Sequence, residues 1–163
     1  VAQLQFKGQV VASALVGQRD PRAGSDPPGE TTAFRLGSVT KVFTVIMLYQ
    51  LLERGVVQSL DDPVSKYEPR FRAINSYSDS KWQFTLRQLS SQLSGLPLES
   101  PCPMFDCHVS TEEVLRRWGS TPGAIWPEDT QASYSNFAFS LLGHVLSGLA
   151  GLPYADYVRR HIP

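Results

Sequence analysis

The first 32 residues predict a hairpin followed by a loop. Apolar and polar side chains alternate over residues 3–6, and the stretch 9–16 is rich in small and β-branched apolar residues, so each is expected to form a strand. Lys7-Gly8 between them is a hairpin signal, although a weaker one than Asn-Gly. The prolines and glycines of 17–32 indicate a loop, because no regular element tolerates them at this density.

The longest apolar run, residues 42–52, predicts the central helix. Only Thr44 and Gln50 interrupt it, and a helix that is apolar on nearly every face is expected to be buried. Arg54-Gly55 should end it, with a basic last turn and a glycine just beyond. The run is too short to cross a bilayer, so the sequence predicts no membrane-spanning segment.

The remainder predicts short helices joined by loops. Two capping boxes, each a hydroxyl residue with Gln or Glu three positions later, indicate helix starts. The expected elements are a helical turn at 60–67, helices beginning at Thr85/Gln88 and Ser110/Glu113, and apolar helices at 137–149 and 153–161. The predicted class is therefore α+β. Two strands do not make a stable sheet alone, so we expect the remaining sheet strands to be missing from these 163 residues.

Composition narrows the function. The length suits one domain, and the 42% of hydrophobic residues suits a packed core. Fifteen basic residues balance 15 acidic ones, so the sequence gives no electrostatic indication of a nucleic-acid partner. No basic stretch followed by an apolar one opens the sequence, so we expect no signal peptide within these 163 residues.

Two cysteines, Cys102 and Cys107, lie five residues apart. They suit either a disulfide closing a small loop in an oxidising compartment or two free thiols, and the sequence leaves both open. Zinc would need more ligands than His108 can add, so no metal site is predicted.

The segment 34–41, F-R-L-G-S-V-T-K, contains Ser-x-x-Lys. Ser38 and Lys41 are three residues apart, so they share one face of a helix and the amine can reach the hydroxyl. A serine is a poor nucleophile until a neighbour takes its proton, and a lysine takes it only in the neutral form that burial favours. The ordinary alternative is a helix cap beside a solvated lysine. A second copy, Ser78 to Lys81, lies in a polar stretch and is interpreted as coincidence.

Tyr134 and Asn136, in Y-S-N, are the next candidates. In an extended backbone, residues two apart can point into one cleft, where the phenol could relay a proton and the amide could bind a substrate carbonyl. Alternatively, Tyr134 anchors a loop and Asn136 caps the helix that follows. A small helical domain with chance motifs would keep Ser38 and Tyr134 far apart.

Together these stretches resemble the serine β-lactamase-like, or penicillin-binding-protein-like, superfamily, in particular class C β-lactamases, DD-peptidases and their eukaryotic relatives. The resemblance rests on four ordered segments, in which Tyr134 lies 96 positions after Ser38. They are F-R-L-G-S-V-T-K-V-F-T at 34–44, L-D-D-P-V-S-K-Y at 60–67, L-S-G-L-P at 93–97 and A-S-Y-S-N-F-A-F-S-L-L-G at 132–143.

The resemblance implies roles for four residues. Ser38 matches the acylated serine, Lys41 its base, Tyr134 the general acid/base and Asn136 the substrate-binding amide. The implied chemistry is acyl transfer through a serine ester, on an amide, β-lactam or ester of a small-molecule or peptide substrate, without a cofactor. The family is mostly extracytoplasmic, which slightly favours that location without fixing it.

The chain departs from the family pattern at two places. Gln92 stands where the family commonly has a histidine of mainly structural use. The family's third motif, Lys-Thr-Gly or His-x-Gly, does not occur, since His108 and His144 lack the glycine and are interpreted as structural.

We therefore expect a single truncated domain over 1–163, of hairpin and Ser-x-x-Lys helix (1–60), helical region (61–133) and Tyr-x-Asn part (134–163). This partial β-lactamase/transpeptidase-like fold is expected to leave an open sheet edge and an apolar face. Turnover should then be slight. The alternative function is a non-catalytic scaffold or binding protein.

Overall fold

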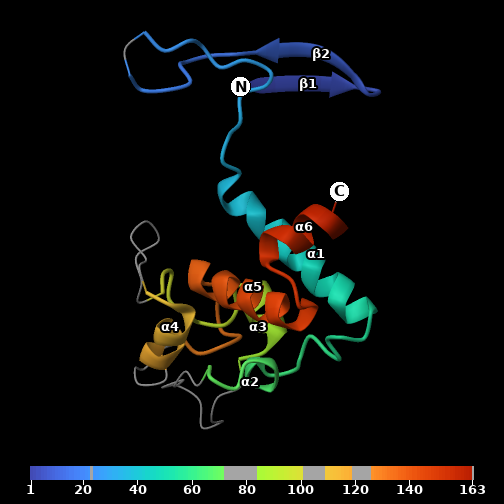
Figure 1. The fold of residues 1–163 in the computed structure, drawn as a ribbon, viewed down its shortest axis with the longest axis vertical. Coiled ribbons are helices and arrows are strands. Elements are labelled where there is room, and N and C mark those ends of the chain that lie inside the picture. The colour runs from blue at the N-terminus through green and yellow to red at the C-terminus, as the bar shows by residue number, and fades with distance from the viewer. Residues whose placement is uncertain (23, 72–83, 101–108, 119–125, 163) are drawn as a thin grey trace. The chain divides into compact units, whose positions relative to one another are not determined.

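A computed structural model describes residues 1–22, 24–71, 84–100, 109–118 and 126–162. The chain forms two compact units, Val1–Gly37 and Ser38–Pro163, which are described separately (Figure 1). The first unit holds the two strands, and the second holds the helices. Both cysteines, His108 and the second Ser-x-x-Lys lie outside the described residues, so the predictions on them stay predictions.

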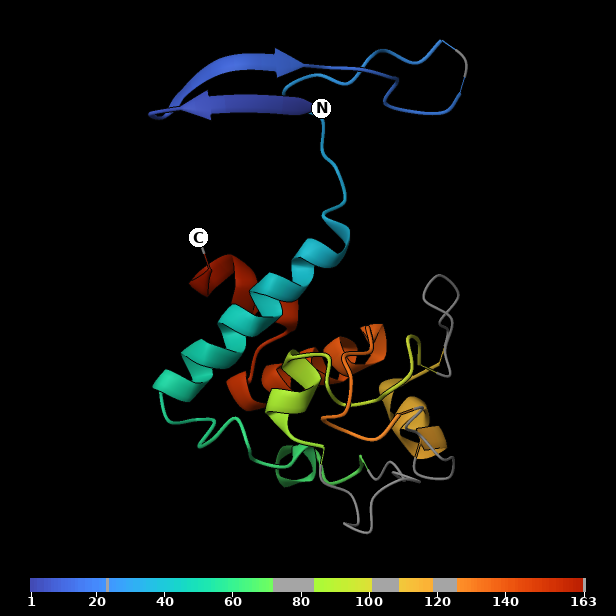
Figure 2. The same cartoon turned by 180° about the vertical axis from the view of Figure 1, so that it is seen from behind.

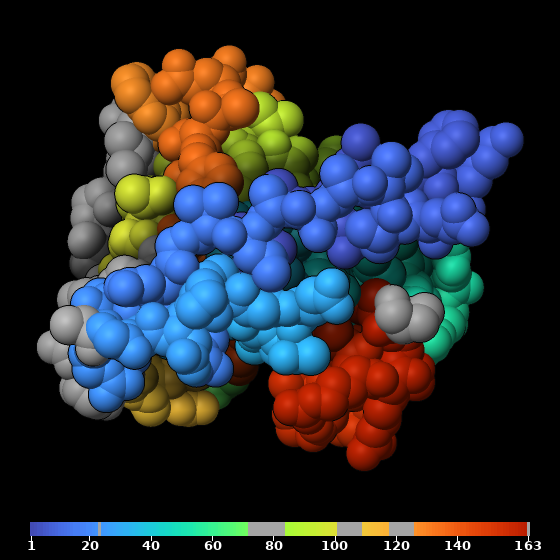
Figure 3. Space-filling view, turned by 90° about the horizontal axis from the view of Figure 1, so that it is seen from above, coloured from blue at the N-terminus to red at the C-terminus, as the bar shows by residue number. Residues whose placement is uncertain are grey.

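The first unit is the predicted hairpin. Strand β1 (Ala2–Phe6) pairs antiparallel with β2 (Gln9–Ala14). Lys7 and Gly8 link them with φ values of 49° and 78°, the pair of positive φ angles that a tight hairpin turn of this hand requires. Every residue of both strands is exposed, and the strands are drawn in dark blue in Figure 3. Within the described residues the sheet has only these two strands.

The second unit is built around one apolar helix. A 3-10 turn, Gly37–Val39, leads into the first helix, and the elements in order are α1 (Thr40–Glu53), α2 (Val64–Tyr67), α3 (Leu86–Ser90), α4 (Thr111–Trp118), α5 (Asn136–Ala150) and α6 (Tyr154–His161). Helix α5 contacts α1, α2, α3 and α6 and lies in the middle of the unit (Figures 1 and 2). The elements expected from the sequence are therefore present, in the expected order.

The hydrophobic core lies where these helices meet. Leu142 and Leu146 of α5 are fully buried, as are Met47 and Leu48 of α1. Each such side chain contributes roughly 1.5–3 kcal/mol when it is removed from water. The core therefore fixes α5 against α1, which matters because both helices begin at the candidate site.

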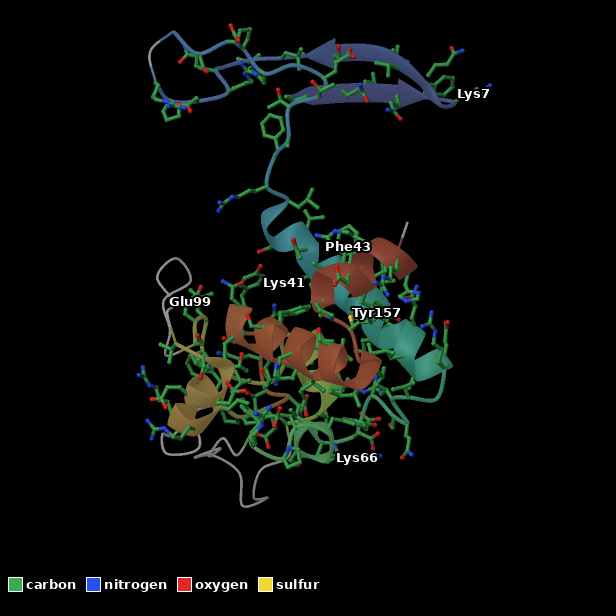
Figure 4. The ribbon with its side chains drawn as sticks, in the orientation of Figure 1. Lys7, Lys41, Phe43, Lys66, Glu99 and Tyr157 are labelled. Atoms are coloured by element: carbon green, nitrogen blue, oxygen red, sulfur yellow. The ribbon has the colours of Figure 1, made fainter. Side chains whose placement is uncertain are left out.

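Helix α6 ties down α1 by polar contacts as well. The phenol of Tyr154 lies 2.9 Å from the hydroxyl of Thr44, and that of Tyr157 donates to the side-chain oxygen of Gln50 at 3.1 Å. Tyr157 is almost fully buried between the two helices (Figure 4). Contacts of this kind leave α1 little freedom to shift along its axis.

Helix α1 is buried on one face only. Its buried residues include Met47, Leu48 and Leu51, whereas Val42 and Ile46 on the other side remain 55% and 36% exposed. The expectation of an all-round buried helix is thus met on one face. The apolar face that the sequence predicted to stay open is present.

The two predicted capping boxes differ in outcome. Thr85 accepts from the backbone of Gln88, and the Gln88 side chain accepts from the backbone of Thr85, so that box is complete. At Ser110 only half of the box forms, since its hydroxyl accepts from the Glu113 backbone. The Glu113 carboxylate instead accepts from Arg116 and from the next arginine along, because charged donors bind it more strongly than a backbone amide does.

His144 lies on α5, as predicted, and is part of an ionic group. Its Nε2 is 2.9 Å from a carboxylate oxygen of Glu68, a nearly buried residue that also binds Arg70. Hydrogen bonds from Arg70, then from His144, lower the pKa of Glu68 to about 2 against the cost of burial. The group joins α5 to the segment after α2.

No single described helix is long and apolar enough to cross a membrane, although α5 and α6 taken together, with a bend of 71°, meet the requirement of length and composition.

Candidate active site

Ser38 and Lys41 meet at the start of α1. Ser38 is exposed in the 3-10 turn before the helix, and Lys41 lies in the first helical turn, so three residues separate them. The Lys41 amine lies 3.2 Å from the Ser38 hydroxyl oxygen. The N-cap residue is Val39, and no side chain caps the helix. The simple interpretation of Ser38 as a helix cap beside a solvated lysine is therefore wrong.

Tyr134 reaches both of these groups from a distant part of the chain. Its phenol donates to the Ser38 hydroxyl at 2.5 Å and accepts from the Lys41 amine at 2.8 Å. The amine also lies over the tyrosine ring, 4.5 Å from its centroid. A domain in which the motifs occur by chance would not bring Ser38 and Tyr134 together, so that interpretation is excluded.

Asn136 completes the group. Its side-chain oxygen accepts from the Lys41 amine at 2.6 Å, although the residue is the first of α5 and 95 positions away. The residue that caps α5 is Ser135, whose hydroxyl accepts from the backbone of Ala138 at 2.9 Å. The alternative that Asn136 is the helix cap is therefore wrong, and its amide is left for the site.

Residues 92–98 hold the Tyr-x-Asn motif in place. The buried Ser135 hydroxyl donates to the Pro97 carbonyl at 2.7 Å, and the Ser135 backbone donates to the side-chain oxygen of Gln92 at 2.7 Å. The Asn136 backbone donates to the Leu98 carbonyl at 2.8 Å. Gln92 thus supports the motif from the position where the family commonly has its histidine.

Gly95 permits a close approach within this segment. Its φ of +68° lies in the left-handed region, and a Cβ built there would lie 2.0 Å from the Trp126 carbonyl oxygen. Only glycine fits both conditions without displacing the backbone. The Gly in L-S-G-L-P is therefore required by packing next to the site.

The electrostatics of the site act on the tyrosine. The hydrogen bond from Lys41, and then the one with Ser38, lower the pKa of Tyr134 below its ordinary value. A phenol with a lowered pKa gives up and takes back a proton more easily near neutral pH. The arrangement joins the Ser38 hydroxyl to an amine and a phenol, two groups that are able to carry a hydroxyl proton.

The Lys41 amine thus lies within hydrogen-bonding distance of the other three predicted site residues, and the Tyr134 phenol also reaches Ser38. Among the residues that the structure describes, no three His, Cys, Asp or Glu side chains gather as a metal site. The sequence prediction did miss Glu99, which accepts from the Asn136 amide at 2.7 Å. Its position two residues after L-S-G-L-P was the available signal.

Comparison with known proteins identifies the family of this chain. The family model described as Beta-lactamase matches residues 5–162. Beta-lactamase-like protein 2 of Dictyostelium discoideum is 37% identical over 99% of this chain and 30% of its own length. The D-alanyl-D-alanine-carboxypeptidase/endopeptidase AmpH of Escherichia coli is 34% identical over 83% of this chain and 35% of its own.

Among solved structures, the beta-lactamase/D-alanine carboxypeptidase from Yersinia pestis, complexed with citrate, superposes with a TM-score of 0.77 and 32% identity. The match covers 94% of this chain and 44% of that one. The chain thus spans about a third of the length of these curated relatives and under half of that structure. Family model, relatives and fold agree, and the chain belongs to the beta-lactamase family.

Proposed function

We propose that this chain carries the nucleophile of a serine acyl hydrolase or peptidase, with Ser38 as the residue that becomes acylated. The observation that supports this most is the position of the Ser38 hydroxyl, 3.2 Å from the Lys41 amine and 2.5 Å from the Tyr134 phenol. A serine that only caps a helix or packs in a loop does not require an amine and a phenol beside its hydroxyl. The substrate is an amide, β-lactam or ester.

The first step forms a bond between the Ser38 oxygen and the substrate carbonyl carbon. Lys41, as the base, takes the hydroxyl proton, and the carbonyl oxygen becomes an oxyanion. The Ser38 backbone amide precedes the first turn of α1, where unpaired N–H groups and the helix dipole favour negative charge. That amide would supply one oxyanion donor.

The second step breaks the bond to the leaving group. Tyr134 hands a proton to the departing nitrogen or oxygen, and Lys41 restores the phenol proton through their 2.8 Å hydrogen bond. The product is an ester on Ser38, which water hydrolyses when the same two groups work in reverse. Asn136 would hold an amide carbonyl of the acyl group through its side-chain NH2.

Neither Lys-Thr-Gly nor His-x-Gly occurs in the sequence, so the proposed chemistry is limited to Ser38, Lys41, Tyr134 and Asn136. The names of two similar proteins include D-alanine carboxypeptidase activity. Peptides ending in D-alanine and β-lactams are therefore the first substrates to test.

The test compares covalent labelling by a fluorescent penicillin and by a fluorophosphonate. Ser38→Ala should abolish labelling, whereas Ser78→Ala, in the other Ser-x-x-Lys, should leave it unchanged. Lys41→Met and Tyr134→Phe should each slow it by about 100-fold or more, the usual contribution of a proton-transfer group. Equal labelling of the Ser38→Ala variant and the unchanged chain would overturn the proposal.

A non-catalytic scaffold makes the opposite prediction. It gives no adduct with either probe, and Ser38→Ala leaves its function unchanged. The two proposals are thus separated by the same set of variants.

A further inference from the structure

Glu99 lies at the edge of the site, in contact with the substrate-binding amide. Its carboxylate accepts from the Asn136 side-chain nitrogen at 2.7 Å, while the oxygen of the same amide accepts from Lys41 at 2.6 Å. Glu99 follows the segment that supports the motif, and Figure 4 shows it and Lys41 coming from different elements. The Asn136 amide thus lies between a carboxylate that accepts from its nitrogen and an amine that donates to its oxygen.

These two neighbours allow the amide only one orientation. A carboxylate only accepts hydrogen bonds, so Glu99 requires the nitrogen side of the amide, and the Lys41 amine has N–H groups to donate to the oxygen side. Rotating the Asn136 amide by half a turn would set its oxygen against the Glu99 carboxylate and its NH2 against the Lys41 amine. The hydrogen bond to the Glu99 carboxylate would be lost, and a bond to a carboxylate is stronger than one between neutral groups.

The backbone makes this arrangement firm. The Asn136 backbone N–H donates to the Leu98 carbonyl, so the residue before Glu99 is bound directly to the first residue of α5. Glu99 itself is half-buried. Its carboxylate therefore reaches the amide from a fixed backbone position.

We propose that Glu99 is a positioning residue of the serine site, which orients the Asn136 amide for binding an acyl-group carbonyl. The inference rests on the proposed function. An asparagine amide has two N–H donors. Glu99 takes one of them, and this holds the second N–H in one direction, where a substrate carbonyl can accept it. Without Glu99, only Lys41 among the described residues would restrain the amide.

The first test uses the difference between the two labelling reagents. A penicillin carries a side-chain amide carbonyl, whereas a simple alkyl fluorophosphonate carries none. Glu99→Ala should slow labelling by the penicillin by about tenfold, the effect of one lost hydrogen bond of this kind. Labelling by the fluorophosphonate should change less than about threefold. Glu53→Ala, at the exposed end of α1, is the control and should change neither rate.

A double-mutant cycle shows whether Glu99 acts through Asn136. In an Asn136→Ala background, Glu99→Ala should have no further effect on the penicillin rate, because the group it orients is absent. Glu99→Gln should lie between the two, since an amide can still accept but also permits the rotated orientation. Equal loss with both reagents, or an undiminished effect in the Asn136→Ala background, would overturn the proposal.

A second readout needs no reaction at Ser38, so failure of the proposed function would not hide the answer. The side-chain NH2 signals of Asn136 in a proton–nitrogen NMR spectrum report its hydrogen bonds directly. Glu99→Ala should shift one of the two proton signals and speed its exchange with water, and Glu53→Ala should leave both unchanged. If Glu99→Ala leaves both signals where they are, Glu99 does not position the amide.

Discussion

Replacing Ser135 with alanine should weaken the fold and the site together. The Ser135 hydroxyl is fully buried and makes two hydrogen bonds, accepting from the Ala138 backbone and donating to the Pro97 carbonyl. The first is the cap of α5, and loss of such a cap costs about 1 kcal/mol. The second leaves a carbonyl without its donor, at about 1–3 kcal/mol. Pro97 is only partly buried, so the lower part of that range applies, and the sum is about 2–3 kcal/mol.

Urea unfolding followed by helical circular dichroism measures this loss. Ser140→Ala is the matched control, because Ser140 is an exposed serine in the same helix and its replacement should change the free energy of unfolding by less than about 0.5 kcal/mol. Since Tyr134 and Asn136 flank Ser135, labelling at Ser38 should also slow. Equal stability of the two variants would refute the role given to the Ser135 hydroxyl.

Three further outcomes are expected. Lys41→Met should raise the pKa of Tyr134 toward its ordinary value, because the largest cause of its lowering is the hydrogen bond from Lys41; ring-carbon NMR measures it. The pKa of Glu68 is lowered from 4.5 to about 2 in the folded chain, chiefly by Arg70, so its contribution to stability is present above pH 4.5 and is lost as the pH falls toward 2. That contribution is up to about 3 kcal/mol, reduced by solvent at the half-exposed Arg70, and acid unfolding of Glu68→Gln measures it. Gly95→Ala should lower the unfolding midpoint in urea, because of its positive φ and the carbonyl oxygen 2.0 Å from a new Cβ.

Each of these has a contrary result. A Tyr134 pKa unchanged in Lys41→Met would mean that the two groups do not interact in solution. If Glu68→Gln and the unchanged chain unfold in acid along the same curve, ionised Glu68 does not contribute to the stability of the fold. A Gly95→Ala variant as stable as the unchanged chain would show that the backbone there is free to move. Gly55→Ala is the control, because Gly55 has a positive φ but open space around it; its loss of stability measures the backbone strain without the steric contact.

The local parts of this fold could be predicted because local chemistry decides them. Lys7-Gly8 accepts two positive φ angles, and the apolar run at 137–149 can only be a buried helix in a chain of this size. The Thr85 box is likewise complete within four residues. Periodicity and capping are sufficient for such elements.

The sequence could not predict which of two neighbouring residues caps a helix, or which of several possible partners a side chain binds. Ser135 and Asn136 are both good caps, and the extended backbone at Ser135, with φ −131° and ψ 111°, gives the cap to the serine. Glu113 fits the pattern of a capping box, but its carboxylate accepts hydrogen bonds from arginine side chains such as Arg116 instead of from the helix backbone. Helix α1 is apolar all round, and only the tertiary packing decides which face is buried.

The site itself depended on resemblance rather than on pattern. Nothing in the periodicity brings Tyr134 to Ser38 across 96 residues; the order of the four segments predicted it, and the structure places the phenol 2.5 Å from the hydroxyl. Glu99 was missed since no motif includes it. A single carboxylate in the sequence indicates a role only once its contact with the Asn136 amide is known.

The most direct test of the central claim is to locate the covalent adduct. After reaction with a fluorophosphonate, trypsin should cut at Arg35 and Lys41 and release residues 36–41, in which Ser38 is the only serine. Mass spectrometry is predicted to find the added phosphonyl mass on this peptide, and to find none in the Ser38→Ala variant. An adduct on another peptide alone, or no adduct under conditions that label a known serine hydrolase, would contradict the account.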